Sequence, residues 1–182
     1  MTKPSLSFRP FTRRDAEAIV WWRYPAPYEI YNIRGSALDA EVDSLLRPEL
    51  HYFAVLNAEE EMVAFRCFGT DAQVSGGDYS EEALDMGGGL RPDLTGRGLG
   101  PLVIESAMSF AVREFHPRRF RTTIASFNAR ARHVCEALGY VAQSEFVRPS
   151  DRRRFVVLTR EIDSSDERRR AAAQPARPDN AG

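Results

Sequence analysis

A strand, a glycine-rich turn and a helix follow one another between Leu84 and Phe110, and this junction constrains the chain more than any other segment. The turn reads TGRGLG and leads directly into the helix. The first amides of a helix have no acceptor within it, and the helix dipole places partial positive charge beside them. Glycine lets the backbone approach an anion closely because it has no Cβ atom. The junction therefore predicts a phosphate-binding turn, although glycines could also serve only to connect a strand tightly to a helix.

Two widespread phosphate loops do not fit this turn. The Walker A loop requires a lysine directly after its last glycine, and Lys3 is the only lysine in the chain. The dinucleotide-binding fingerprint G-x-G-x-x-G would begin at Gly96 and would then require a glycine where Pro101 stands. The sequence therefore excludes a P-loop NTPase and does not match the dinucleotide fingerprint.

The segment LRPDLTGRGLG resembles the pyrophosphate loop of the GNAT superfamily of N-acetyltransferases, which reads R/Q-x-x-G-x-G/A between a strand and a helix. A second block, NARARHVCEALGY, is similar to the N-x-x-A…Y-E-x-x-G-F/Y helix and strand of that family. The resemblance covers the chain from Phe8 to Ile162. Two positions depart from the pattern: Thr95 stands where Gln or Arg is usual, and Cys135 where many members carry a tyrosine as general acid.

The resemblance implies that acetyl-CoA is the cosubstrate. Backbone groups around Leu90 and Pro92 would pair with its pantetheine arm like an added strand. Asn128 would reach the cosubstrate, cap its own helix, or do both. The amides expected to bind the pyrophosphate are those of Arg97, Gly98, Leu99 and Gly100, and the Arg97 side chain would either assist them or be solvated.

Two residues are candidates for proton transfer. Asp85 opens the glycine-rich strand, where a carboxylate could accept a proton from the attacking amine, or it could be a solvated strand end. Cys135 follows Ala131 at helical spacing, which favours a buried small residue. Its thiol could alternatively donate a proton near the thioester sulfur.

The segment WWRYPAPYEIYN lies where the resemblance implies an acceptor pocket. Tyr28 and Tyr31, which follow the prolines, are the predicted substrate contacts, whereas such aromatic residues more often belong to a core. The histidines at positions 51, 116 and 133 have no metal-ligand spacing, so no metal site is expected.

The composition supports one globular domain of 182 residues with 43% hydrophobic residues and a net charge of −1. We expect a domain over residues 1–162 and a disordered tail over 163–182, where large apolar residues are scarce. The near-neutral charge gives no attraction to nucleic acid or membranes, and the dispersed arginines do not favour a nucleic-acid binder. The N-terminus has no signal-peptide core, and two cysteines without short spacing predict the cytoplasm.

Periodicity predicts the element order β-α-α-β-β-β-α-β-α-β-β, with a bulge or a close backbone approach at Gly87–Gly89. The resemblance implies an α/β (α+β) fold: a mixed, mostly antiparallel sheet that is splayed in its middle and flanked by about four helices. The expected reaction is direct transfer of an acetyl group from acetyl-CoA to a primary amine of an unidentified small molecule or peptide. An acetyl-CoA-binding protein with weak or no transferase activity is the alternative, and a homodimer is possible.

Overall fold

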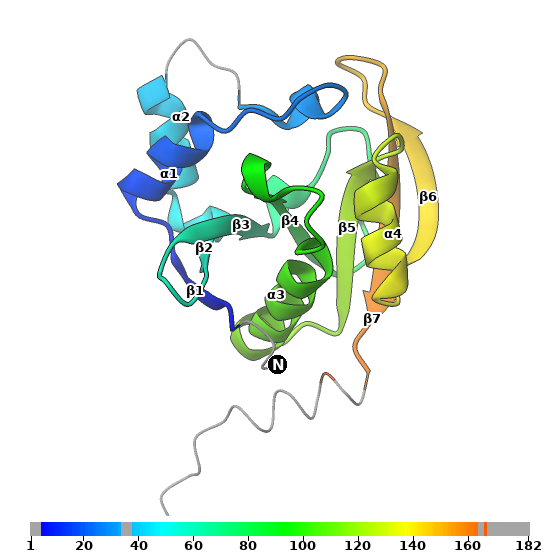
Figure 1. The fold of residues 1–182 in the computed structure, drawn as a ribbon. Helices are drawn as coiled ribbons and strands as arrows, with labels where there is room; N and C mark the ends of the chain where they lie inside the picture. The colour runs from blue at the N-terminus through cyan, green and yellow to red at the C-terminus, as the bar shows by residue number, and fades with distance from the viewer. Residues whose placement is uncertain (1–4, 34–37, 164–165, 167–182) are drawn as a thin grey trace, which may run out of the picture.

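A computed structural model describes residues 5–33, 38–163 and 166 (Figure 1). Seven strands form one sheet in the order β1-β2-β3-β4-β5-β7-β6. All neighbours are antiparallel except β4 and β5, which are parallel. The strands are β1 Ser7–Pro10, β2 Phe53–Leu56, β3 Met62–Phe68, β4 Leu84–Leu90, β5 Arg119–Ala125, β6 Val141–Val147 and β7 Arg154–Glu161.

The described residues form four α-helices and four short 3-10 helices, which confirms the predicted element order and the mixed, mostly antiparallel α/β fold. Local signals in the sequence set the helix ends. Thr12 and Asp15 form a capping box at the start of α1. The helices are α1 Arg13–Val20, η1 Tyr28–Tyr31, α2 Leu38–Leu45, η2 Pro48–Leu50, η3 Thr70–Ala72, η4 Pro92–Leu94, α3 Gly100–Phe115 and α4 Ala129–Ala137.

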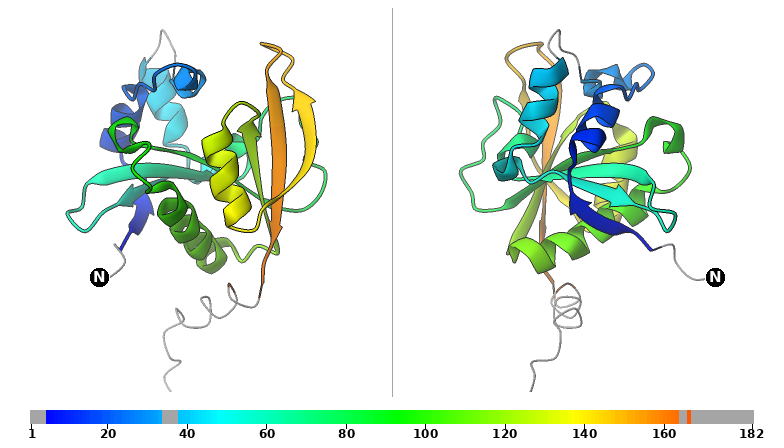
Figure 2. Two further views of the ribbon diagram at one scale, coloured as in Figure 1. Left: turned by 45° about the vertical axis from the view of Figure 1, so that its right-hand side comes forward. Right: turned by 90° about the vertical axis from the view of Figure 1, so that its left-hand side faces the viewer.

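The helices cover the two faces of the sheet in pairs (Figure 2). On one face, α1 and α2 bury Ile19 and Val42 with partly buried aromatic side chains such as Phe65 of β3. On the other face, α3 and α4 pack against a cluster that includes Phe68, also of β3. Successive residues of a strand point to opposite faces, so Arg66 shares the α3 and α4 face with Phe68.

The sheet is splayed between β4 and β5. These strands pair only at Leu84 with Phe120 and at Asp85 with Arg121. Beyond this joined end, β4 continues along β3 as far as Leu90, while β5 continues along β7. The predicted splay is therefore present over residues 86–90, which we call the open end of β4.

The chain continues to make contacts past the predicted domain boundary. Asp166 is buried and accepts a hydrogen bond from Arg160 Nη1 at 2.8 Å. The rest of the predicted tail, residues 164–165 and 167–182, lies outside the described part of the structure. No helix in the described ranges is both long enough and apolar enough to cross a membrane.

Candidate active site

The open end of β4 presents backbone groups that no strand covers. Arg91 N donates to Val63 O at 2.8 Å, and Gly69 N donates to Asp85 O at 2.9 Å, so the odd-numbered residues of β4 face β3. Hydrogen bonding alternates along an antiparallel pair, which turns the backbone of Leu90 away from β3 and toward the splay. Tyr24 Oη donates to the Leu90 carbonyl at 2.8 Å, as this orientation requires.

The three glycines of β4 allow close approach of neighbouring groups. Gly88 has a φ of +141°, and a Cβ atom there would lie 2.2 Å from the Phe65 carbonyl oxygen and 3.0 Å from Arg66 Cδ. A Cβ on Gly89 would lie 2.7 Å from Tyr24 Oη. The register between β3 and β4 is continuous, so of the two predicted alternatives the structure shows close approach.

The turn before α3 offers a row of free amides. Gly96 and Gly98 have φ values of +76° and +77°, and a Cβ atom at either position would meet nothing within 4 Å. Within the described part of the chain, the N–H groups of residues 96 to 100 have no hydrogen-bond acceptor. Pro101 occupies the first turn of α3, where an N–H would lack an acceptor in any case. The turn can therefore surround an anion with several donors.

The preceding 3-10 turn explains the unusual residue at the first loop position. Thr95 Oγ1 donates to the Pro92 carbonyl at 2.7 Å, and Thr95 N donates to the same oxygen at 3.2 Å. Pro92 has no N–H, and its carbonyl is thus engaged inside the turn. The Leu90 carbonyl also has a donor, Tyr24, but Leu90 keeps an N–H, so it is the better placed of the two residues predicted to pair with pantetheine.

Asp85 lies at the joined end of β4 and is only 3% exposed. Arg121 Nε and Nη2 donate to its two carboxylate oxygens at 2.6 and 2.8 Å, and Gln73 Nε2 donates at 2.8 Å. The hydrogen bond with Asp85 raises the pKa of Arg121 despite burial, which acts in the opposite direction. A carboxylate held by three donors is poorly available to a substrate, so the geometry favours a role in joining β4 to β5 over the predicted role of base.

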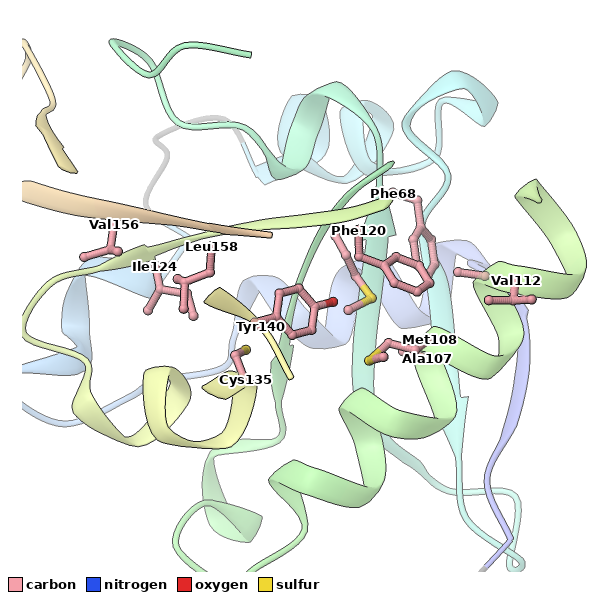
Figure 3. Packing of buried hydrophobic residues seen from close by; sticks show 12 residues of the cluster. Phe68, Ala107, Met108, Val112, Phe120, Ile124, Cys135, Tyr140, Val156 and Leu158 are labelled. Atoms are coloured by element: carbon pink, nitrogen blue, oxygen red, sulfur yellow. The ribbon is translucent and has the colours of Figure 1, made fainter. Parts of the chain in front are cut away.

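Cys135 lies in the hydrophobic core against α3 and is 3% exposed (Figure 3). Burial raises the pKa of its thiol to about 11. Tyr140, which follows α4 and belongs to the same cluster, is also 3% exposed, and its Oη has no hydrogen-bond partner in the described residues. This position agrees with the predicted role of Cys135 as a small residue packed in the core. Proton transfer by its thiol stays a prediction.

The predicted substrate contacts meet the start of α4 across the splay. Tyr28 and Tyr31 of η1 pack against Phe127, with ring centroids 5.7 and 6.5 Å apart respectively. Asn128 Nδ2 donates to Tyr31 Oη at 3.1 Å, and its Oδ1 accepts from Ala131 N at 3.1 Å. Asn128 is therefore the N-cap of α4, which is one of its two predicted roles. Its contact with a cosubstrate, the other role, stays a prediction.

Sequence reasoning missed Tyr24 and Arg66. Tyr24 lies in the segment WWRYPAPYEIYN, but its hydrogen bond with Leu90 is not predictable from the sequence, because a contact over 66 positions leaves no local pattern. Arg66 left one signal, a single charged residue inside the apolar strand MVAFRCF. Arg97, in contrast, has no hydrogen bond or ion pair within the described ranges, which is compatible with either of its predicted roles.

A family model for the acetyltransferase (GNAT) domain matches residues 5–141. The chain belongs to the GNAT family. It therefore has the family's acetyl-transferring architecture, in agreement with the resemblance found in the two sequence blocks. No curated protein matches the chain.

Solved structures share this fold at low sequence identity. A chimera of the spermidine N-acetyltransferase SpeG from Vibrio cholerae and hSSAT is 15% identical, with a TM-score of 0.67 and coverage of 90% of this chain and 97% of that one. A GNAT-family acetyltransferase from Bacillus anthracis is 15% identical, with a TM-score of 0.65 and coverage of 87% and 96%. A dodecameric spermidine N-acetyltransferase from Vibrio cholerae is 16% identical, with a TM-score of 0.60 and coverage of 86% and 93%.

The described residues contain no group of three or more His, Cys, Asp or Glu side chains that could hold a metal ion.

Proposed function

We propose that this enzyme transfers an acetyl group from acetyl-CoA to a primary amine in a ternary complex. The observation that carries the proposal is the row of acceptor-free amides from Gly96 to Gly100 at the start of α3. These donors fit a pyrophosphate, because two neighbouring phosphates can each accept several hydrogen bonds. The Leu90 backbone, which faces the splay, would pair with the pantetheine arm.

The chain would contribute mainly position and electrostatics to the reaction. Acetyl-CoA supplies an activated thioester, and a backbone N–H at the open end of β4 would stabilise the negative charge on its carbonyl oxygen. A new C–N bond forms, the C–S bond breaks, and CoA leaves as the thiolate. The amine's proton would pass to solvent, since Asp85 is held by Arg121 and Gln73.

The acceptor would bind on the η1 side of the splay, near Tyr28 and Tyr31. Glu29 of the same 3-10 helix has a buried Oε2 atom with no hydrogen-bond partner among the described residues. An ammonium group could donate to this oxygen, so we propose a cationic amine as acceptor. The SpeG structures carry the name spermidine N-acetyltransferase, which makes spermidine a reasonable first member of an amine panel.

Calorimetry with CoA and acetyl-CoA tests the proposal directly. The wild-type chain should bind both, and Gly98→Ala should weaken both by about tenfold, because a Cβ at a positive φ displaces the amides. Gly69→Ala is the matched control, since Gly69 also has a positive φ and open surroundings but lies outside the turn. Absence of binding by the wild-type chain would overturn the proposal.

The alternative of an acyl-CoA-binding protein without turnover has one specific argument, Cys135 at the position of the family's tyrosine. Tight binding of acetyl-CoA without transfer to any amine of the panel would favour it.

We also propose self-association, prompted by the dodecameric neighbour, and light scattering of the purified chain tests this separately. The cytoplasmic location stays a prediction.

A further inference from the structure

Arg66 is a buried cation without an anion. It is only 8% exposed, and its Nε is fully buried with no hydrogen-bond partner. In the described ranges, no hydrogen bond or ion pair reaches any atom of its guanidinium. The buried Arg121, by contrast, has a bidentate partner in Asp85. A buried charge is costly unless an opposite charge and hydrogen bonds compensate it.

The Arg66 side chain extends from β3 beneath β4. Its stem lies against Gly88, where a Cβ would be 3.0 Å from Cδ. Its charge acts to lower the pKa values of Cys135 and Tyr140, although burial raises both. These two residues belong to α4 and to the segment that follows it, on the far side of β4 from β3. The stem of Arg66 therefore lies under Gly88, in the open end of β4.

Tyr140, whose charge acts on the pKa of Arg66, supplies a second unmatched donor. Its Oη is buried without a hydrogen-bond partner, just as Arg66 Nε is. The groups that act on the pKa of Arg66 besides burial are Cys67, Tyr140 and Cys135, and none of them is a carboxylate. A guanidinium and a phenol that share a buried region without an acceptor are suited to a carboxylate, which accepts hydrogen bonds through two oxygens.

The face of the sheet on which Arg66 lies indicates whether the acceptor or the acyl donor would carry this carboxylate. Tyr28 and Tyr31 contact Phe127 at the η1 side, where we place the acceptor, whereas Arg66 is on the α3 and α4 face. The donor enters along the open edge of β4, so the part of it that could reach beneath β4 is the acyl chain beyond the thioester.

We propose that Arg66 and Tyr140 form a carboxylate-binding subsite for the acyl group, so that the enzyme also takes dicarboxylic acyl-CoA donors and binds them more tightly than neutral ones. This inference rests on the proposed acyl-CoA site. The transfer is the same reaction: the C–N bond forms, the C–S bond breaks, CoA leaves as thiolate and the amine's proton passes to solvent. The distal carboxylate remains ionised and is carried into the product.

Succinyl-CoA and butyryl-CoA are the matched probes, because both acyl chains have four carbons and only one ends in a carboxylate. Calorimetry on the full chain should show succinyl-CoA binding about tenfold more tightly than butyryl-CoA. Arg66→Met keeps the apolar stem of the side chain, removes its guanidinium and should remove this preference. Tyr140→Phe should reduce it in part. Arg113→Met, at an exposed site of α3, is the control and should keep it.

Thermal unfolding separates binding from folding. Arg66→Met should unfold at the same or a higher temperature than the wild type, because an unpaired buried charge is replaced by an apolar group. Succinyl-CoA should raise the unfolding temperature of the wild type more than that of the variant.

Equal binding of succinyl-CoA and butyryl-CoA would overturn the inference while leaving acyl-CoA binding intact. Slower acetyl transfer by Arg66→Met with an unchanged donor preference would overturn it too, and would assign the charge to the leaving thiolate. Failure of every acyl-CoA to bind would remove the proposed function itself.

Discussion

The two ends of β4 each have a buried arginine nearby, and the two arginines differ in their partners. At the joined end, Arg121 of β5 forms a bidentate ion pair with Asp85 and stacks over Tyr79, with 4.8 Å from Cζ to the ring centroid. At the open end, Arg66 of β3 has neither a carboxylate nor a hydrogen bond in the described residues. Both side chains are more than nine-tenths buried, so exposure does not explain the difference.

The difference separates a contact that holds the fold from the group that we propose binds a ligand. The Asp85–Arg121 pair joins the two halves of the sheet where β4 and β5 still exchange backbone contacts. Past that point the strands diverge, glycine replaces side chains along β4, and polar groups are left without partners. The sheet is therefore joined by a buried ion pair at one end and splayed at the other.

Breaking the joined end should produce the largest effect. Arg121→Met leaves Asp85 buried without its partner, and we expect a loss of about 3–5 kcal/mol in the free energy of unfolding. Denaturant titration followed by circular dichroism measures it. Arg119→Met is the control, because Arg119 on the same strand pairs with Glu81 and Glu161 at the surface, and its loss should be much smaller. Equal losses for the two variants would contradict the assigned role of the buried pair.

A side chain on Gly88 should disturb the open end. Gly88→Ala places a Cβ 2.2 Å from the Phe65 carbonyl at a φ of +141°, and we expect a loss of about 2–3 kcal/mol. Gly69→Ala is the control, with a φ of +98° and no neighbour within 4 Å. Its cost should come from the backbone alone, because φ +98° with ψ −146° is a conformation that side-chain-bearing residues rarely adopt, and should be smaller than that of Gly88→Ala. If Gly88→Ala were as stable as Gly69→Ala, the close packing of β3 on β4 would be disproved.

Cys135→Ala tests whether the open end uses this thiol. The kcat of acetyl transfer should change by less than about threefold, whereas removal of a general acid would cost about a hundredfold or more. Because folding raises the pKa of Cys135 from 9.0 to about 11, the folded chain keeps this proton at pH values where the unfolded chain loses it. The contribution of Cys135 to stability is therefore constant below pH 9 and falls between pH 9 and 11.

The pH dependence of unfolding provides the second readout for the same variant. Stability of the wild type should fall more steeply above pH 9 than that of Cys135→Ala, by about 1 kcal/mol per pH unit at most. A hundredfold loss of kcat, with unchanged unfolding profiles, would instead identify Cys135 as the proton donor.

The smallest effect concerns the hydrogen bond that reaches the open end from Tyr24, in the segment between α1 and η1. Tyr24→Phe removes the hydroxyl that donates to the Leu90 carbonyl, and we expect a loss of about 1 kcal/mol in stability. Acetyl-CoA affinity should stay within a few-fold of wild type, because the Leu90 backbone still faces the splay. Tyr79→Phe, whose hydroxyl bonds Val74 and Thr123 near the joined end, is the matched control and should leave acetyl-CoA binding unchanged. Complete loss of acetyl-CoA binding by Tyr24→Phe alone would place the phenol itself in the site.

Local signals made much of the fold predictable. The element order, the N-cap Asn128 and the glycine turn before α3 all depend on a few adjacent residues, and each is present in the structure. The partner of Asp85 could not be predicted, because Arg121 lies 36 positions away and the pairing depends on the register of β4 with β5. The same limit hid the contact of Tyr24 with Leu90.

The sequence by itself determined the order of elements, the family and the position of the glycine turn before α3, because backbone conformation at glycines, prolines and caps is set by short-range sterics and hydrogen bonds. Only the tertiary structure decided which charges are paired. Arg66 and Arg121 are indistinguishable as arginines in apolar strands, and their environments differ because β5 accompanies β4 at one end and leaves it at the other. Pairing of buried charges depends on distance in space, which strand order and register fix and residue type does not.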